Sequence, residues 1–351
     1  SEQTLFEELK ILSAGYFLTI SNRNKEINLT QYWDYKFCES NNKIVYQEYK
    51  EELDRLLYQA VSRQLVGDVE LGSYLSGGVD SGSISAIASS KINNLKTFTC
   101  GFDLSSASGI ELNFDERHKA EALAALFKTE HYEIVLKAGD MERSLSKVVS
   151  HLEEPRAGQS YPNYFAAKLT SNFVKVVLSG TGGDELFCGY PWRYYRSLNN
   201  QNFENYVDTY FNYWQRLLNY EELKKVFSPI WNEVKEVNTR DIFKNVFSTH
   251  ENQLNSPKDY INHSLYFEAK TFLHSLFIIE DKLSMANSLE NRVPFMDNDL
   301  VDFALKCPVN FKLKNLEKAL EMNENEFSKK LAYFQKTNEG KQILRDAMEK
   351  Y

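Results

Sequence analysis

The sequence predicts an α/β protein in which a twisted parallel sheet carries helices on both faces and is followed by a helical subdomain. Strand-like and helix-like segments alternate between residues 69 and 178, an order that is typical of a parallel sheet. The segment 174–178 is rich in Val and Leu, as expected of a strand buried on both faces. After Tyr190 strand signals become rare, and aromatic, Leu, Glu and Lys residues recur at helical spacing.

The elements can be assigned in order along the chain. A short strand-like piece covers residues 15–20, and polar turn residues follow it. Apolar residues then recur at helical spacing and predict a helix over residues 47–64. Residues 316–351 are expected to form two charged amphipathic helices that carry little functional information. Between these segments we expect strands over residues 69–75, 96–102, 131–136 and 174–178, and helices over 82–90 and 116–127, with two more before residue 174.

Composition and charge exclude several classes of protein. The chain is 42% hydrophobic and 26% charged, which is typical of a folded soluble protein. Its formal net charge of −8 argues against broad, non-specific binding to nucleic acid or to an anionic membrane. The four cysteines include no Cys-x-x-Cys pair, which excludes a zinc ribbon or a disulfide scaffold and fits a reducing compartment. Because no apolar stretch is long enough to span a bilayer and no signal peptide is visible, we expect a cytoplasmic protein.

A Gly-rich turn follows the strand expected over residues 69–75. It reads Ser76-Gly77-Gly78-Val79-Asp80-Ser81. The glycines let the backbone approach an anion, and N–H groups of the turn and of the next helix converge on negative charge. The serine hydroxyls add donors, and Asp80 adds an oxygen ligand suited to Mg²⁺. The alternative is an ordinary turn with a Ser cap. No Gly-Lys-Ser/Thr follows, so the motif is not a Walker A loop; it resembles the PP-loop of ATP pyrophosphatases.

A second Gly-rich turn follows the strand expected over residues 174–178. Residues 179–187 read Ser-Gly-Thr-Gly-Gly-Asp-Glu-Leu-Phe, so that Asp184 and Glu185 stand at a helix start. A helix dipole favours carboxylates there, and both residues could be simple caps. Both turns lie at the carboxyl ends of strands in one sheet, however, so we expect Asp184 to face Asp80. Two facing carboxylates are what a Mg²⁺–ATP complex needs.

Two later segments carry charges close to apolar residues. Lys282 follows eight mostly apolar residues and is expected to be partly desolvated; the alternative is a surface lysine paired with a neighbouring acid. Residues 288–297 alternate in charge before a proline. They are expected to form a tight, ion-paired turn that fixes the Lys282 helix.

Taken in order, these segments resemble the synthetase domain of glutamine-dependent asparagine synthetases over nearly the whole chain. By this resemblance, residues 1–45 are the remnant of a linker after a glutaminase domain, 46–190 are the PP-loop ATP-binding core, and 191–351 are the helical part of the synthetase domain. The motifs that carry the resemblance are Ser76-Gly-Gly-Val-Asp-Ser81, Phe114-Asp-Glu-Arg117, Glu154-Pro155, the second Gly-rich turn, Asp281-Lys-Leu-Ser-Met-Ala286 and Glu290-x-Arg-x-Pro-Phe-x-Asp297.

The resemblance implies an ATP-dependent, AMP-forming amide ligase. In that family a side-chain carboxylate attacks the α-phosphorus of ATP, which gives an acyl-adenylate and pyrophosphate. Ammonia then displaces AMP and leaves an amide. For this chain the resemblance implies aspartate and ammonia as small-molecule substrates, asparagine as the product, and ATP and Mg²⁺ as the cofactors.

The resemblance also implies a role for each matching residue. Asp80 and Asp184 would bind Mg²⁺, Lys282 would neutralise the phosphates, and Thr181 would belong to the catalytic group. Apart from the resemblance, Glu154 and Arg156 stand in an expected strand–helix loop and are the candidates for binding the acceptor acid, in which Arg156 would clamp a carboxylate; a solvated loop arginine is the alternative. The residues expected around ATP are Leu75, Ser76, Gly77, Gly78, Val79, Asp80, Ser81, Cys100, Gly101, Phe102, Ser179, Gly180, Gly182 and Gly183.

Departures from the family's pattern leave alternatives open. Asparagine synthetases commonly carry Glu where this chain has Thr181, and a hydroxyl cannot serve as a general base near neutral pH. The acceptor could therefore be another carboxylate, as in a sugar acid, a β-lactam or a peptide ring closure, or the chain could bind ATP without turnover. It begins at Ser1 without a glutaminase's N-terminal cysteine, so we expect it to use free ammonia or a separate glutaminase. The sequence is compatible with a homodimer; no nucleic acid or membrane partner is expected.

Overall fold

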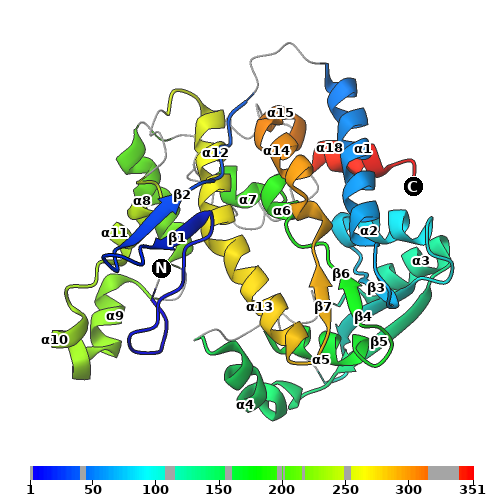
Figure 1. Cartoon of the computed structure of the whole chain (residues 1–351), viewed down its shortest axis with the longest axis horizontal. Helices are drawn as coiled ribbons and strands as arrows, with labels where there is room; N and C mark the ends of the chain where they lie inside the picture. Colours follow the sequence, from blue (N-terminus) through cyan, green and yellow to red (C-terminus); the bar gives the residue numbers. More distant parts are fainter. Residues whose placement is uncertain are drawn as a thin grey trace.

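Five parallel strands form the central sheet of the protein (Figure 1). The computed structural model describes residues 3–39, 45–106, 115–154, 160–195, 200, 202–215, 218–248, 254–314 and 340–351. The strand order is β5-β4-β3-β6-β7, and every neighbouring pair is parallel. The predicted α/β class is therefore confirmed. The strands are β3 (Leu71–Tyr74), β4 (Lys96–Phe102), β5 (Glu130–Leu136), β6 (Val176–Leu178) and β7 (Glu290–Arg292).

Helices cover both faces of this sheet (Figure 1). The first group contains α1 (Tyr46–Gln64), α2 (Val79–Ser89) and α3 (Arg117–Phe127), of which α2 contacts β3, and α3 contacts β4 and β5. The second group contains α4 (Asp140–Leu152), α5 (Ser160–Thr170) and α13 (His274–Met285), of which α5 contacts β4 and β5, and α13 contacts β7. Right-handed crossovers place connections that run in opposite directions along a sheet on opposite faces, which accounts for the two groups.

The order of the strands reverses between β3 and β6. From β3 the chain moves outward to β4 and β5, and it then returns to the other side of β3 to form β6. The carboxyl ends of β3 and β6 are therefore neighbours at a topological switch point, where open α/β sheets bind ligands. Both Gly-rich turns leave from these two ends, the first into α2 and the second into the short helix α6 (Gly183–Leu186).

The two turns touch because glycine stands at their contact. A Cβ added to Gly180 would lie 2.8 Å from the backbone nitrogen of Ser81, and one added to Gly183 would lie 2.6 Å from Cγ of Asp80. A side chain at either position would force the turns apart. Between them, Gly182 has a φ of +104°, a conformation that L side chains rarely adopt.

Two strands that the sequence did not predict complete the architecture. Residues 290–292, expected within an ion-paired turn, form the edge strand β7, whose backbone pairs with β6. The ion pair is present inside that strand, between Arg292 Nε and Glu290 (2.6 Å). Residues expected as polar turn form β2 (Ile27–Gln31), which pairs antiparallel with β1 (Tyr16–Ile20). Both segments are too polar or too exposed to show a buried-strand pattern, and backbone pairing alone identifies them.

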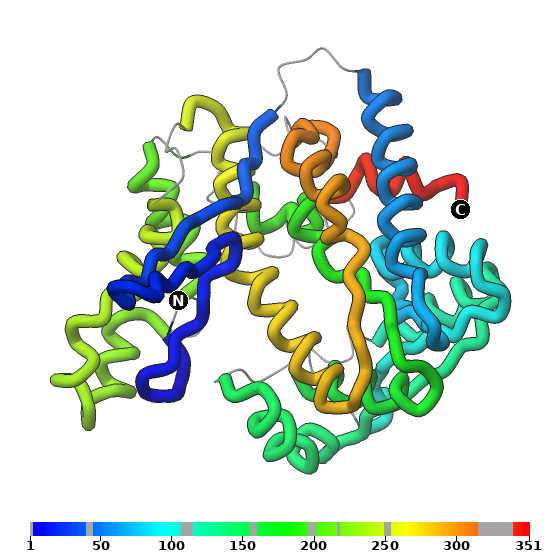
Figure 2. Tube along the Cα trace, in the orientation of Figure 1, coloured from blue at the N-terminus to red at the C-terminus, as the bar shows by residue number. Residues whose placement is uncertain are grey.

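The rest of the described chain is mainly helical, as the spacing after Tyr190 predicts. Figure 2 shows the C-terminal segment beside α1, although the two are far apart in the sequence. The contact is between α1 and α18. None of the described helices combines the length and apolar character needed to cross a bilayer. The remaining elements are α7 (Pro191–Tyr194), α8 (Phe203–Trp214), α9 (Tyr220–Val226), η3 (Ser228–Ile230), α10 (Trp231–Val234), α11 (Thr239–Asn245), α12 (Pro257–Glu268), η4 (Ala269–Leu273), η5 (Pro294–Met296), α14 (Asn298–Lys306), α15 (Val309–Lys312) and α18 (Gln342–Met348).

A buried ion pair joins α7 to α12 within the helical part. Arg193 Nη1 donates to Glu268 Oε2 at 3.0 Å, and the hydroxyl of Tyr210 donates to Glu268 Oε1 at 2.6 Å. The Arg193 guanidinium also lies over the rings of Tyr190 (3.7 Å) and Phe272 (4.6 Å), where cation–π attraction adds to the pairing. Burial raises the pKa of Glu268, while Arg193 and the tyrosine hydroxyls oppose the rise. This cluster holds α7, and with it Tyr190, against α12.

We expect the Gly180→Ala substitution to destabilise the fold by about 1–3 kcal/mol, because its Cβ meets backbone atoms that cannot rotate away. Gly82→Ala is the matched control, because Gly82 lies within α2 and its added Cβ would meet only the Leu123 side chain, at 3.5 Å. This variant should be as stable as the unmodified chain or slightly more stable. Urea denaturation of both variants measures the difference. Equal stabilities would show that the two turns do not need to touch.

We expect Arg193→Met to lower the free energy of unfolding by about 3–5 kcal/mol, since it leaves the Glu268 carboxylate buried without its cation. The double variant Arg193→Met/Glu268→Leu should recover much of that loss, because it removes both charges. A double-mutant cycle in urea gives the coupling between them. Additive effects of the two single substitutions would contradict the pairing.

Candidate nucleotide-binding site

A cavity of about 480 Å³ opens at the carboxyl ends of β3, β4 and β6. Its size lies in the range of small-molecule sites, and it occupies the switch point of the sheet. Both Gly-rich turns and the helix α13 contribute to its wall. The residues around it are Tyr74, Leu75, Ser76, Gly78, Asp80, Ser81, Phe98, Thr99, Cys100, Glu116, Asn163, Ala166, Ser179, Gly180, Thr181, Gly182, Asp184, Glu185, Tyr190, Leu276, Glu280, Ser284, Asn291 and Lys341.

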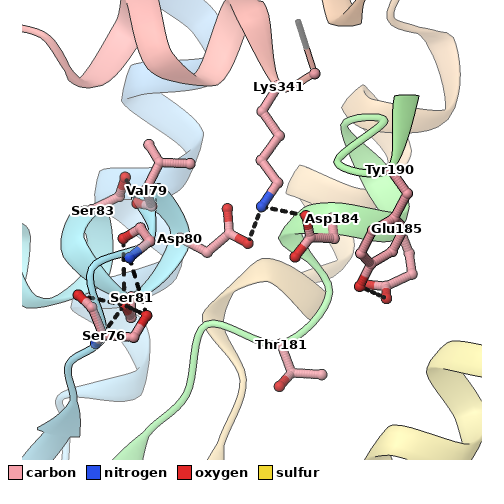
Figure 3. Close-up of polar contacts among 12 residues, drawn as sticks. Ser76, Val79, Asp80, Ser81, Ser83, Thr181, Asp184, Glu185, Tyr190 and Lys341 are labelled. Atoms are coloured by element: carbon pink, nitrogen blue, oxygen red, sulfur yellow. Dashed lines mark hydrogen bonds and ion pairs between the residues drawn. The ribbon is translucent and has the colours of Figure 1, made fainter. Parts of the chain in front are cut away.

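The first turn is held in shape by its own serines (Figure 3). The hydroxyls of Ser76 and Ser81 lie 2.9 Å apart, and the backbone N–H of Ser76 donates to Ser81 Oγ at 2.9 Å. The N–H of Gly78 donates to Ser76 Oγ at 3.1 Å. These bonds fold the chain at the start of α2 into a compact loop beside the cavity, a position suited to an anion.

Three segments that are distant in sequence meet at one ammonium group. Lys341 Nζ lies 2.6 Å from Asp80 Oδ2 and 2.5 Å from Asp184 Oδ1, so that a single cation bridges the two carboxylates (Figure 3). Asp80 belongs to the first turn and Asp184 to the second, while Lys341 precedes α18. The predicted facing of Asp80 and Asp184 across the two turns is therefore present in the structure.

Burial and charge set the electrostatics of this bridge. Burial raises the pKa of Asp80 to about 7, although the Lys341 ammonium opposes the rise; the nearby Asp184 carboxylate adds to it. Burial alone would lower the pKa of Lys341, but the two carboxylates more than compensate and raise it above its usual value. A buried ammonium that remains charged between two acids is a strong local source of positive potential.

The donor set also fits a divalent cation. Asp80 Oδ1 is buried and has no hydrogen-bond partner among the described residues, which leaves one hard oxygen available for a ligand. Asp184 contributes a second carboxylate, which shares the Lys341 ammonium with Asp80. Mg²⁺ typically takes one or two protein carboxylates and completes its shell with water and substrate phosphates. Within the described ranges, no group of three or more His, Cys, Asp or Glu side chains is placed to hold a metal.

A second polar cluster lies on the wall formed by the second turn, β7 and α13. The Thr181 hydroxyl donates to Glu280 Oε1, and the Ser179 hydroxyl donates to Glu280 Oε2 at 3.2 Å. Asn291 Nδ2 donates to Glu280 Oε2 at 2.9 Å. All four residues surround the cavity. Burial raises the pKa of Glu280, and these three donors oppose the rise.

A fourth acid, Glu185, lies behind the second turn. The Tyr190 hydroxyl donates to Glu185 Oε1 at 3.0 Å (Figure 3). Burial, with the neighbouring Asp184 carboxylate, raises the pKa of Glu185 to about 8. Because Tyr190 also stacks on Arg193, this hydrogen bond connects the cavity to the buried ion pair of the helical part.

Most residues expected around the nucleotide do surround the cavity, and some do not. Gly77, Val79, Gly101, Phe102 and Gly183 are not part of its wall. Phe102 is instead buried in an apolar cluster with Leu136. Of the expected acceptor-binding pair, Glu154 does not contribute to the cavity and Arg156 lies outside the described residues.

Lys282, which was expected to neutralise the phosphates, does not line the cavity. Its ammonium donates to the carbonyl of Leu152 at 2.5 Å and lies 3.8 Å from Glu153, at the end of α4 and away from the cavity wall. Glu280, two residues earlier, does face the cavity. Two residues correspond to about 200° of rotation in an α-helix, so Lys282 is on the opposite side of α13 from the residue that reaches the site.

Lys341, like Glu280, lines the cavity but was not predicted from the sequence. It stands in the C-terminal segment that was expected to carry little functional information, 261 positions from Asp80. Its φ of +57° is unusual for a residue other than glycine, and such a conformation costs free energy that the ion pairs offset. The only local signal is a Gly-Lys pair before a short apolar helix, which by itself does not identify a site.

Comparison with known proteins finds asparagine synthetases among the relatives of this chain. The glutamine-hydrolyzing asparagine synthetase 1 of Bacillus subtilis is 32% identical to this chain over 290 residues, which cover 75% of this chain and 44% of the relative. The glutamine-hydrolyzing asparagine synthetase 3 of the same organism is 26% identical over 346 residues, or 90% of this chain and 52% of the relative. This chain thus spans about half the length of the curated relatives it matches.

Solved structures give a weaker likeness. The NH3-dependent NAD synthetase of Campylobacter jejuni is 13% identical, with a TM-score of 0.28, covering 67% of this chain and 96% of that one.

A family model described as asparagine synthase matches residues 52–351 and so includes both Gly-rich turns, Glu280 and Lys341. The motifs first identified in the sequence therefore lead to a confirmed assignment: this chain belongs to the asparagine synthase family.

Proposed function

We propose that this chain is an ATP-dependent amide ligase that adenylates a carboxylic acid and transfers nitrogen to it. The first candidate for the acid is the side-chain carboxyl of aspartate, which would give asparagine, AMP and pyrophosphate. Family membership supports the reaction class, and the Asp80–Lys341–Asp184 bridge is the observation that carries the proposal. A carboxylate is a poor acyl donor, and adenylation supplies the leaving group that it lacks.

The residues of the site divide the work of adenylation. The first turn, with its helix N-terminus, would hold the pyrophosphate that departs when the acid attacks the α-phosphorus. Asp80 and Asp184 would hold Mg²⁺, which supplies charge neutralisation on the phosphates. Lys341 would then be released from the two carboxylates and donate to the phosphate oxygens on which negative charge develops. Its buried position keeps this donor oriented before the reaction begins.

The acceptor acid and the nitrogen source are separate parts of the proposal. Among the described residues that surround the cavity, Lys341 is the one basic side chain, whereas the acids include Glu116, Glu185 and Glu280. The second carboxylate of aspartate would need a cation of its own, so an acid with a neutral or cationic remainder is the second candidate. We propose that nitrogen arrives as ammonia, either free or released by a glutaminase, since the relatives named above are glutamine-hydrolyzing.

Acid-dependent exchange of radiolabelled pyrophosphate into ATP tests the first half-reaction. We expect exchange with aspartate or with one acid of a panel that includes sugar acids and amino-acid derivatives, and AMP rather than ADP as the product once ammonia is added. Mass spectrometry of the products identifies the acid and shows whether glutamine can replace ammonia. ATP binding without exchange for any acid would overturn the proposed function.

Lys341→Met should reduce acid-dependent exchange by at least about 100-fold, because it removes the cation that stabilises charge on the departing phosphates. Lys282→Met is the matched control and should retain nearly full exchange, since its ammonium is bound to the Leu152 carbonyl. Fluorescence titration with an ATP analogue checks that both variants still bind nucleotide. A loss of exchange in the Lys282 variant, with Lys341→Met unaffected, would reverse the assignment.

A further inference from the structure

The Glu280 cluster has no part in the adenylation step described above. Glu280 stands on α13 and projects to the cavity wall, and its carboxylate accepts three hydrogen bonds from neutral donors. Within the described residues no ion pair compensates its charge. A carboxylate kept without a cation at a cavity wall costs free energy, and it is available to accept a proton or to attract a cationic group.

The position of the cluster relative to the bridge suggests its use. Thr181 lies on the second turn, three residues before Asp184, and its hydroxyl donates to Glu280. In Figure 3 the Thr181 side chain lies on the other side of the turn from Lys341 and Asp184. The cavity therefore has a cationic corner for phosphates and, on the opposite side of the same turn, an acidic wall.

A second observation on this wall points to a ligand with N–H groups. Asn291 donates through Nδ2 to Glu280, which fixes the orientation of its amide, and its Oδ1 is buried without a hydrogen-bond partner in the described structure. An orphaned acceptor beside a carboxylate matches a donor that arrives with the substrate. Ammonia or a primary amine supplies such donors.

We propose that Glu280 is the general base for nitrogen transfer, with Thr181, Ser179 and Asn291 positioning it. The proposal rests on the proposed function and assigns its second half-reaction. The amine nitrogen attacks the acyl carbon of the adenylate and forms a C–N bond. The proton that the nitrogen must lose passes to the Glu280 carboxylate, directly or through the Thr181 hydroxyl. The C–O bond to AMP then breaks, and its electron pair leaves with the phosphate oxygen. The threonine thus need not act as a base, because the carboxylate beside it does.

The test separates the two half-reactions in the Glu280→Gln variant. We expect acid-dependent ATP–pyrophosphate exchange close to that of the unmodified chain, and amide formation from ammonia reduced by at least about 100-fold, the usual contribution of a general base. With hydroxylamine, a much weaker base than ammonia that attacks without help, hydroxamate formation should be largely retained. A merely structural role would lower the rates with both nucleophiles alike.

Three further variants keep the test decisive. Asp281→Asn changes an exposed acid one position along α13 and should leave both half-reactions unchanged. Thr181→Val should slow amide formation without abolishing exchange, and Glu280→Asp, which keeps the carboxylate but shortens its reach, serves if the Gln variant does not fold. Unchanged amide formation in Glu280→Gln, or exchange that falls together with amide formation, would overturn the role of Glu280. Absence of exchange in the unmodified chain would instead overturn the proposed function, and this inference with it.

Discussion

The site depends on bringing two carboxylates into the interior of the protein close enough to share one cation. Such a pair is unfavourable by itself, since burial and mutual repulsion both oppose two adjacent negative charges. Lys341 satisfies the pair in this structure with contacts of 2.6 and 2.5 Å, and Mg²⁺ with ATP phosphates would satisfy it during the proposed reaction. The need for a cation between Asp80 and Asp184 links the fold, the C-terminal segment and the proposed chemistry.

The topology of the sheet makes this arrangement attainable. The reversal of strand order puts the carboxyl ends of β3 and β6 side by side, and glycine at positions 180 and 183 lets the turns that follow them make contact. The helical part then encloses the site from outside the sheet. Its buried Arg193–Glu268 pair holds Tyr190, whose hydroxyl binds Glu185 behind the second turn. The second turn is therefore supported from behind by Tyr190 and Glu185, which also line the cavity.

The residue at position 181 illustrates how a distant element sets the surroundings of a residue in the site. A threonine there cannot act as a base, and taken alone it raises doubt about amide formation. In three dimensions the threonine is bonded to a carboxylate contributed by α13. If Glu280 is the general base proposed above, this carboxylate accepts the proton that nitrogen transfer releases. The acidic character of that wall is also what an amine nucleophile would favour electrostatically.

The sequence by itself determined the α/β class, the family and the positions of most strands of the sheet and of the helices that cover it. It also predicted that Asp80 and Asp184 face each other. These features follow from local patterns: alternating elements, apolar runs, and glycines that stand directly after strands. Only the tertiary structure decided which lysine lies between the two carboxylates, since the Lys282 ammonium contacts the end of α4 and the Lys341 ammonium contacts Asp80 and Asp184. It also decided that β7 is a strand and that Glu280 meets Thr181. Helix rotation, edge pairing and long-range ion pairs depend on contacts between residues that are far apart in the chain, and these contacts leave little trace in local composition.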